Sequence, residues 1–208
     1  MKTISPQRLA GLQAAPDTGI TPRVFAFFTV RNRTDGAPVS IGMWNGDWDV
    51  TLDVVNGFTG LTESRTYYGE CNLVVGDVQL VTDLSIQTLN VSMSQLAPPC
   101  QQLARTYDPR LGKVEIHKIE LDRLTRMPVS APEIDFMGEI DGAPIETPRA
   151  GSDGSIQYKI NSDAISMLAI VNPRKSSYEG QRRRSGDEFG KYASTVGDWK
   201  IPWGQEAK

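Results

Sequence analysis

Apolar and polar residues alternate with a period of two over much of the chain. Alternation of this kind is typical of strands that bury one face. It predicts strands at 48–54, 82–96, 113–124, 133–141 and 155–160. The segment 23–30, RVFAFFTV, is apolar at both odd and even positions, which predicts a central strand buried on both faces. The glycine-containing GAPVSIG, 36–42, is interpreted as a turn.

Two of the predicted strands change phase midway. In 82–96 the apolar residues are even-numbered over 84–86 and odd-numbered over 89–93, and 113–124 repeats the change. A slip of one residue moves every following side chain to the other face, so we expect a β-bulge near Thr88 and another in the second strand. Bulges supply curvature, which predicts a coiled sheet, barrel or sandwich.

Helical signals are few. Ser5 followed by Pro6 predicts the start of a short N-terminal helix, and PPCQQLARTY, 98–107, predicts an interior helix. The strand pattern stops after about Val171. We therefore expect a mainly β domain over residues 1–173 with one or two short helices, and an extended C-terminal arm over 174–208 with at most one weak helical turn.

The strand phases predict a single β-rich core. Its expected members are Val50, Leu52, Ile86, Leu89, Val91, Ile116, Ile119, Phe136 and Ile140. Trp48 alternates with the first two of these residues, so we expect it to face the core as well.

Composition restricts the class of protein. The chain has 208 residues with 39% hydrophobic and 23% charged residues, which are globular values. A net charge of -3 argues against a general nucleic-acid binder. No segment resembles a secretion signal or is long and apolar enough for a membrane span, so we expect synthesis in the cytoplasm. Cys71 and Cys100 are expected to be reduced, metal-free thiols, because two cysteines make neither a disulfide framework nor a metal cluster.

Candidate chemistry is sparse. His117 has no accompanying serine or cysteine motif and is interpreted as a half-buried or solvated structural residue rather than a catalytic base. Asp47 and Asp49 would share a strand face and could ligate a cation, but the glycine and distal glutamate of a calcium loop are missing. The sequence therefore supports no catalytic, cofactor or metal site, and we expect no enzyme; a hydrolytic tail peptidase or lysin is disfavoured on the same ground.

In order and spacing, the segments resemble the N-terminal hub domain of tail-tip and baseplate proteins from long-tailed bacteriophages and gene-transfer agents. The segments that carry the resemblance are ISPQRLAGLQ, RVFAFFTVRNRTDG, WDVTLDVVNGFTGLTES, TDLSIQTLNVSMSQL, LARTYDPRLGKVEIHKIELDRL and IDFMGEIDGAPIE. The closing segment resembles the C-terminal arm of such proteins through Ser177, Gln181, Arg182, Arg183, Gly186, Asp187, Phe189, Tyr192, Trp203 and Gly204. Some relatives hold an iron–sulfur cluster on C-terminal cysteines; this chain has no cysteine after Cys100.

The resemblance implies a tail-tube-like hub domain in a virion, assembled in the host cytoplasm as a homo-oligomeric ring, with other tail proteins above and below it. We favour threefold over sixfold symmetry. Arginine and aromatic residues are enriched at protein interfaces. The arm is therefore expected to contact neighbouring subunits through Arg182, Arg183, Arg184, Asp187, Phe189, Tyr192, Trp199 and Trp203.

A carbohydrate-binding or adhesin-like β-sandwich is the alternative from another class. In that protein, exposed Trp44, Trp48, Tyr67 and Tyr68 would stack on sugar rings. The two hypotheses differ in oligomeric state, because a ring component associates and a binding module can remain a monomer.

Overall fold

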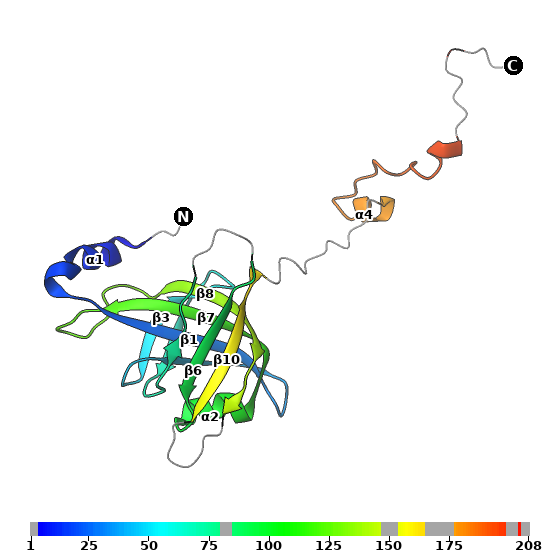
Figure 1. Cartoon of the computed structure of the whole chain (residues 1–208). Helices are drawn as coiled ribbons and strands as arrows, with labels where there is room; N and C mark the ends of the chain where they lie inside the picture. The colour runs from blue at the N-terminus through cyan, green and yellow to red at the C-terminus, as the bar shows by residue number, and fades with distance from the viewer. Residues whose placement is uncertain (1–3, 80–84, 147–153, 165–176, 199–203, 205–208) are drawn as a thin grey trace. The chain divides into compact units, whose positions relative to one another are not determined.

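The computed structural model describes residues 4–79, 85–146, 154–164, 177–198 and 204 (Figure 1). The chain forms two compact units, Met1–Met167 and Leu168–Lys208, which are treated separately below. The first unit is mainly β, as predicted. Its elements are α1 (Pro6–Thr18), β1 (Thr21–Asn32), β2 (Pro38–Trp44), β3 (Val50–Val55), β4 (Thr62–Tyr68), β5 (Val74–Val75), β6 (Thr88–Ser94), α2 (Pro98–Gln101), the π-helical turn η1 (Gln102–Thr106), β7 (Tyr107–Leu121), β8 (Glu133–Gly142), β9 (Ile145–Glu146) and β10 (Ser155–Ser162).

One curled sheet contains all of these strands. Its order is β3-β4-β2-β1-β7-β8-β10-β6-β5, with β9 paired to β10. The described pairs are antiparallel except β2 with β4, which run parallel. Figure 1 shows β6 and β10 curving round to face β1 and β7. The sequence prediction of a coiled, mainly β domain is confirmed at this level.

The sheet encloses two apolar clusters rather than the single core that was predicted. The larger cluster lies inside the curl, where Phe28 of β1 meets Tyr158 of β10 with ring centroids 5.6 Å apart. The smaller cluster lies between the β3–β4 hairpin and the opposite face of β1 and β7. Its members are Phe25, Trp44, Val54, Tyr67, Ile119 and Leu121. Strands β1 and β7 therefore divide the two clusters, which confirms the two-faced burial predicted for 23–30.

This division also explains the phase change in β7. Val114 and Ile116 enter the larger cluster, whereas Ile119 enters the smaller one on the other face. Pairing with β1 continues without interruption from Thr21↔Leu121 to Thr29↔Lys113. Over this stretch the register shifts against β8, between Ile116 and His117, where β8 carries one more residue than β7; a second shift, against β1, lies further toward the start of β7, between Thr29 and Arg31 of β1. A bulge is present, as predicted. The apolar residues change face, however, because one part of the strand packs into the larger cluster and the next part packs into the smaller cluster.

Several predicted core positions are corrected. Six of the nine are buried, but Ile86 is 41% exposed and Val50 and Leu52 are only half-buried. Strand β6 begins at Thr88, after Ile86, so the long bulged strand predicted for 82–96 is wrong within the described residues. Residues 80–84 lie outside the described part of the chain.

Two further strand assignments differ from expectation. The segment interpreted as a turn at 36–42 is largely strand β2, because pairing with β1 outweighs its low local strand propensity. Trp48 precedes β3 instead of belonging to it and is 39% exposed. Its carbonyl accepts a hydrogen bond from Trp44 Nε1 at 2.6 Å, so the bend at 45–48 directs Trp44, not Trp48, into the smaller cluster.

The helices follow their sequence signals. Ser5 caps α1 by accepting a hydrogen bond from Arg8 N at 3.3 Å. Arg8 then joins the helix to the sheet through ion pairs with Glu120, at 2.8 Å, and Glu133. The predicted interior helix is formed by α2 and η1 together.

The second unit has little regular structure among its described residues. It contains α4 (Tyr178–Arg182), capped by Ser177, and one 3-10 turn, η2 (Val196–Asp198). From Ser177 to Asp198 no residue is buried, so this segment forms no core of its own.

Candidate functional site

A buried ion pair joins β4 to β7 inside the smaller cluster. Arg65 of β4 donates from Nη1 to Glu115 Oε2 at 3.2 Å and from Nη2 to Glu115 Oε1 at 3.0 Å. The Arg65 and Glu115 side chains are only 2% and 3% exposed. The two-point geometry matches the planar guanidinium to the carboxylate, which offsets much of the cost of desolvating both charges.

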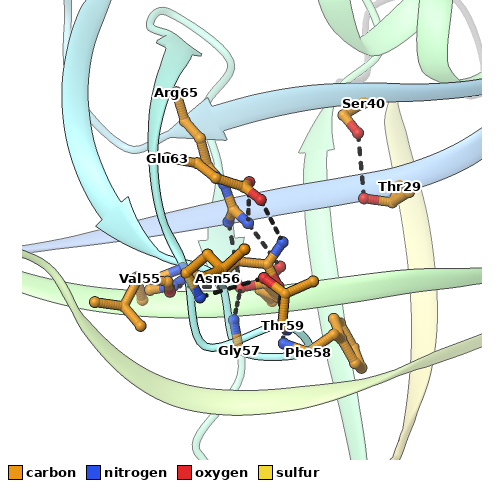
Figure 2. A network of polar contacts seen from close by, with 12 residues as sticks. Thr29, Ser40, Val55, Asn56, Gly57, Phe58, Thr59, Glu63 and Arg65 are labelled. Carbon is orange, nitrogen blue, oxygen red and sulfur yellow. Dashed lines mark hydrogen bonds and ion pairs between the residues drawn. The ribbon is translucent and has the colours of Figure 1, made fainter.

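Glu63 and the turn after β3 extend this pair into a network (Figure 2). Glu63 Oε2 accepts from Arg65 Nε at 3.3 Å and Nη2 at 3.2 Å, while its Oε1 accepts from Asn56 Nδ2 at 3.1 Å. The backbone N–H of Gly57 donates to Glu115 Oε2 at 2.8 Å. Asn56 also accepts hydrogen bonds from the amides of the next turn, so the turn is built around the network.

His117 lies at the closed end of the network. It is fully buried, so the expectation of a half-buried or solvated side chain is wrong. Its Nε2 is 3.5 Å from the Val55 carbonyl and 3.6 Å from Glu115 Oε2, and its Nδ1 has no hydrogen-bond partner. Burial lowers the pKa of His117, and Arg65 adds to that effect, whereas Glu115 and the Val55 carbonyl oppose it. A neutral ring that donates to Val55 fits this environment.

Two aromatic rings complete the surroundings of Arg65. Its guanidinium carbon lies 4.0 Å from the centre of the Phe27 ring, a cation–π contact. Burial raises the pKa of Tyr67 to about 12, with Arg65 opposing the shift. Tyr67 also packs edge-on against Phe25, with centroids 4.8 Å apart. The Phe27 and Tyr67 rings therefore both contribute to the environment of the Arg65 guanidinium.

An open cleft lies beside the network because β2 and β4 pair over a very short length. Their parallel pairing is limited to Gly42↔Tyr67 and Met43↔Tyr68, and the strands diverge before those residues. The resulting space, here called the β2–β4 cleft, has a volume of about 490 Å³. Its lining residues are Phe27, Thr29, Ser40, Ile41, Gly42, Asn56, Glu63, Ser64, Arg65, Thr66 and Tyr68.

The cleft is polar, and its charged lining residues are Glu63 and Arg65, with Glu115 buried behind them. Two carboxylates, Glu63 and Glu115, share the single guanidinium of Arg65. Glu63 is the more accessible of the two, with 42% of its side chain exposed. Thr29 and Ser40 line the other wall, with their hydroxyls 3.3 Å apart (Figure 2). Chemically, this arrangement suits recognition of a cation with several N–H donors.

The remaining ionisable groups discussed from the sequence are enclosed or engaged locally. His117 and Glu115 are closed off from solvent, and the side chains lining the cleft include no thiol. In the described ranges, no three or more His, Cys, Asp and Glu side chains gather in a way that could hold a metal ion. Asp49 is engaged locally, accepting from Gly69 N at 3.0 Å, and with Asp47 it lies in the bend before β3 and not on a strand face.

The two cysteines are buried free thiols in the larger cluster. Cys71 Sγ lies 3.2 Å from the Gly69 carbonyl, and Cys100 Sγ lies 3.7 Å from Met43 Sδ. A hydrogen bond from Cys100 lowers the pKa of Cys71, and the same contact raises the pKa of Cys100. The thiols are therefore neighbours within the core.

The aromatic platform of the carbohydrate-binding alternative is not formed. Trp44 and Tyr67 are 1% and 0% exposed, since both pack into the smaller cluster. Trp48 and Tyr68 remain accessible, at 39% and 38%. Of the four aromatic rings that the carbohydrate-binding hypothesis requires to be exposed, two are partly exposed and two are buried.

The residues predicted to contact neighbouring subunits lie in the second unit. Arg182, Arg183, Arg184 and Asp187 are exposed, as are Phe189 at 92% and Tyr192 at 59%. Trp199 and Trp203 fall outside the described residues. The three arginines form no ion pair with any described residue, whereas Lys191 pairs with Glu188 at 3.1 Å.

Sequence reasoning missed the Arg65–Glu115 pair. The partners are separated by 50 residues, and their strands are joined only through the three-dimensional fold. A signal was present in β7, where Glu115 and His117 alternate with Val114 and Ile116 in a stretch that is buried on both faces. Polar residues in such a strand indicate a buried network.

Comparison with known proteins assigns no family: no family model matches the chain, and no curated protein matches it either. Within the described ranges, no helix is both long and apolar enough to cross a membrane.

Proposed function

We propose that this protein is a non-enzymatic structural component of the tail of a long-tailed bacteriophage or gene-transfer agent. In this role it forms a homo-oligomeric ring, threefold in preference to sixfold, that joins the tail tube to the tip proteins. The curled sheet serves as the tail-tube-like hub domain, and residues 174–208 serve as the arm that reaches a neighbouring subunit.

The exposure of the arm is the observation that carries this proposal. From Ser177 to Asp198 no side chain is buried, yet the segment presents three consecutive arginines and the nearly fully exposed ring of Phe189. Ordering a chain costs about 1–2 kcal/mol per residue in backbone entropy, so a segment without a core gains stability by binding another surface. Arginine and aromatic side chains are the types enriched at such contacts.

The domain itself provides surfaces suited to assembly. Strand β3 ends one side of the sheet and exposes one row of backbone groups, with Val55 43% and nearby Phe58 39% exposed. Open strand edges and exposed apolar residues at one side of a sheet are typical of surfaces that pair with another chain. These features support a ring component over an isolated binding module.

The test is performed on the particle. Mass spectrometry of purified tails should detect the chain, and cryo-electron microscopy should place it as a ring between the tube and the tip. Deleting its gene should give particles without a complete tail, and supplying the full chain in trans should restore them. Intact, infective particles that lack the chain would overturn the proposal.

A further inference from the structure

Charge is distributed unevenly between the domain and the arm. Residues 174–208 contain eight Lys or Arg and five Asp or Glu, a net charge of +3. Residues 1–173 contain 14 and 20, a net charge of -6. The two parts of the chain are therefore electrostatically complementary. The acidic domain of one copy can attract the basic arm of another copy.

The β2–β4 cleft places one accessible carboxylate, that of Glu63, next to further hydrogen-bond acceptors. Arg65 packs on Phe27 and divides its donors between the buried Glu115 and the more exposed Glu63, so two carboxylates face one guanidinium. Glu63 is half-exposed; its Oε1 accepts from Asn56 and its Oε2 accepts two hydrogen bonds from Arg65. A carboxylate offers about four lone-pair sites, which leaves room for a further donor from outside.

The walls of the cleft match the other donors of a guanidinium. Thr29 and Ser40 contribute hydroxyls from one side, and Ser64 and Thr66 line the other, where the Thr66 hydroxyl is bonded to that of Thr51. The ladder between β2 and β4 stops at Gly42↔Tyr67, so backbone carbonyls before that point are open to an incoming chain. An arginine carries five N–H donors in a planar fork, and several acceptors converging on one cleft suit it better than a lysine.

We propose that the β2–β4 cleft of one copy binds the run Arg182–Arg184 of the C-terminal arm of a second copy, with Glu63 as the accessible partner carboxylate. This inference rests on the proposed ring and specifies its subunit contact. The contact is head-to-tail, because the arm and the cleft are different surfaces of the same chain. A head-to-tail contact generates a closed ring if the rotation closes.

The arm supplies free cations for this contact. Arg182, Arg183 and Arg184 have no ion pair among the described residues, although Asp187 and Glu188 follow closely in sequence. Asp187 Oδ1 accepts from the backbone N–H of Phe189 at 2.9 Å, and Glu188 pairs with Lys191. The nearby acids are thus engaged locally, and the arginines remain available.

Two full-length variants test the contact. The arm variant carries Arg182→Glu, Arg183→Glu and Arg184→Glu, and the cleft variant carries Glu63→Lys. In sedimentation velocity, each alone should associate at least about tenfold more weakly than the wild-type chain, because each places like charges at the contact. An equimolar mixture should form a one-to-one complex, since the cleft of the arm variant is intact and so is the arm of the cleft variant.

Two controls distinguish charge from folding. Asp53→Lys changes an exposed carboxylate on the adjacent strand β3 that does not line the cleft, and it should associate like the wild-type chain. Glu63→Gln keeps the size of the side chain but removes its charge, and it should weaken association while unfolding at a temperature close to that of the wild-type chain. Association should also weaken as salt is raised, because screening acts on an accessible charge contact.

Recovery in the mixture is the decisive result. If both variants are folded and their mixture stays dissociated, or if each alone associates like the wild-type chain, the cleft is not the partner of the arm. A wild-type chain that remains monomeric up to roughly 100 µM, where even weak interfaces are populated, would equally overturn the contact.

The experiments distinguish a wrong assignment of the cleft–arm contact from a wrong assignment of the proposed function. Tails that contain the chain and assemble normally with Glu63→Lys would overturn the cleft contact and leave the structural role standing. Association through the cleft by a chain that is absent from tails would overturn the structural role alone.

Discussion

At the scale of single residues, Arg65 and Glu115 matter most to the smaller cluster. Both are almost completely buried, and each supplies the hydrogen bonds and countercharge that the other requires. Glu63 lies at the solvent side of the same guanidinium, and His117 at the closed side. The network therefore runs from an accessible carboxylate at one end to an enclosed histidine at the other.

Arg65→Met should destabilise the domain by about 3–5 kcal/mol, because it leaves the buried Glu115 carboxylate without its countercharge. The matched control is Arg110→Met, which removes an exposed ion pair with Asp108 whose arginine side chain is 81% exposed, and it should leave stability nearly unchanged. Chemical denaturation measures both. Equal losses in the two variants would show that the buried pair adds no special stability.

His117 predicts a pH dependence of stability. Burial holds its pKa in the folded state below the usual value of about 6.5, so the unfolded chain binds this proton more readily. Stability contributed by the neutral ring is therefore complete above about pH 6.5 and is lost as the pH falls towards the folded-state pKa. The slope is about 1.4 kcal/mol per pH unit for one proton.

His117→Gln provides the comparison, because glutamine can still donate to the Val55 carbonyl but does not titrate. The difference in unfolding free energy between the wild-type chain and the variant should shrink as the pH decreases from about 7.5 to about 5. A difference that is constant over this range would contradict the assignment.

Burial within the larger cluster predicts unequal effects of two isoleucines. Ile116 is fully buried, and Ile116→Ala should cost about 2–5 kcal/mol. Ile86 is 41% exposed and lies outside β6, so Ile86→Ala should change stability by no more than about 0.5 kcal/mol. Thermal or denaturant unfolding distinguishes the two. A large loss at Ile86 would restore the longer strand predicted from the sequence.

At the scale of elements, the short parallel contact between β2 and β4 determines the geometry of the cleft. Gly42 makes this approach possible, since a Cβ there would lie 2.6 Å from the Thr66 carbonyl and 2.7 Å from Tyr67 Cδ1. Gly42 pairs with Phe27 of β1 on its other side, so the residue has no room to shift. The β3–β4 hairpin is thereby fixed over β1 and β7, where it closes the smaller cluster.

Gly42→Ala should therefore destabilise the domain by about 1–3 kcal/mol, as overpacking typically does, and weaken the proposed contact with the arm. Gly142→Ala in β8 is the control, since the nearest atom to its added Cβ would be 3.9 Å away. Denaturant unfolding and sedimentation measure the two effects. A neutral Gly42→Ala variant would show that the hairpin adjusts freely.

At the scale of the whole molecule, the proposed function gives folding and assembly to different parts of the chain. The apolar clusters belong to the first unit, whereas the described part of the second unit buries no side chain. The basic arm and the acidic domain carry net charges of opposite sign. Stability should therefore depend on the domain and association on the arm.

A chain ending at Pro173 should still unfold cooperatively, at nearly the same denaturant concentration as the full chain, because it keeps both apolar clusters. It should fail to join the ring or to complement tail assembly. Denaturant unfolding, sedimentation and particle complementation provide the three measurements. Loss of folding on truncation, combined with an arm that touches no other subunit, would show that the segment packs on its own domain.

The sequence by itself determined the local structure wherever a single local factor was sufficient, such as a helix cap or the number of faces that a strand buries. Ser5 caps α1 because its side chain can accept a hydrogen bond from the first turn. Strand β1 is apolar on both faces because it buries both, and the alternation around Leu89 and Val91 correctly gives the face that these two residues bury. The absence of strand alternation after Val171 likewise indicated a segment without a core.

Tertiary structure decided whatever depended on partners distant along the chain. Strand β2 forms because β1 pairs with it, although its glycine and proline favour a turn. Trp48 faces outward because the bend before β3 gives the buried position to Trp44. Glu115 and Arg65 meet across 50 residues, and the cleft exists because two parallel strands diverge. Alternation tells which residues share a face, but only the folded sheet determines what that face meets.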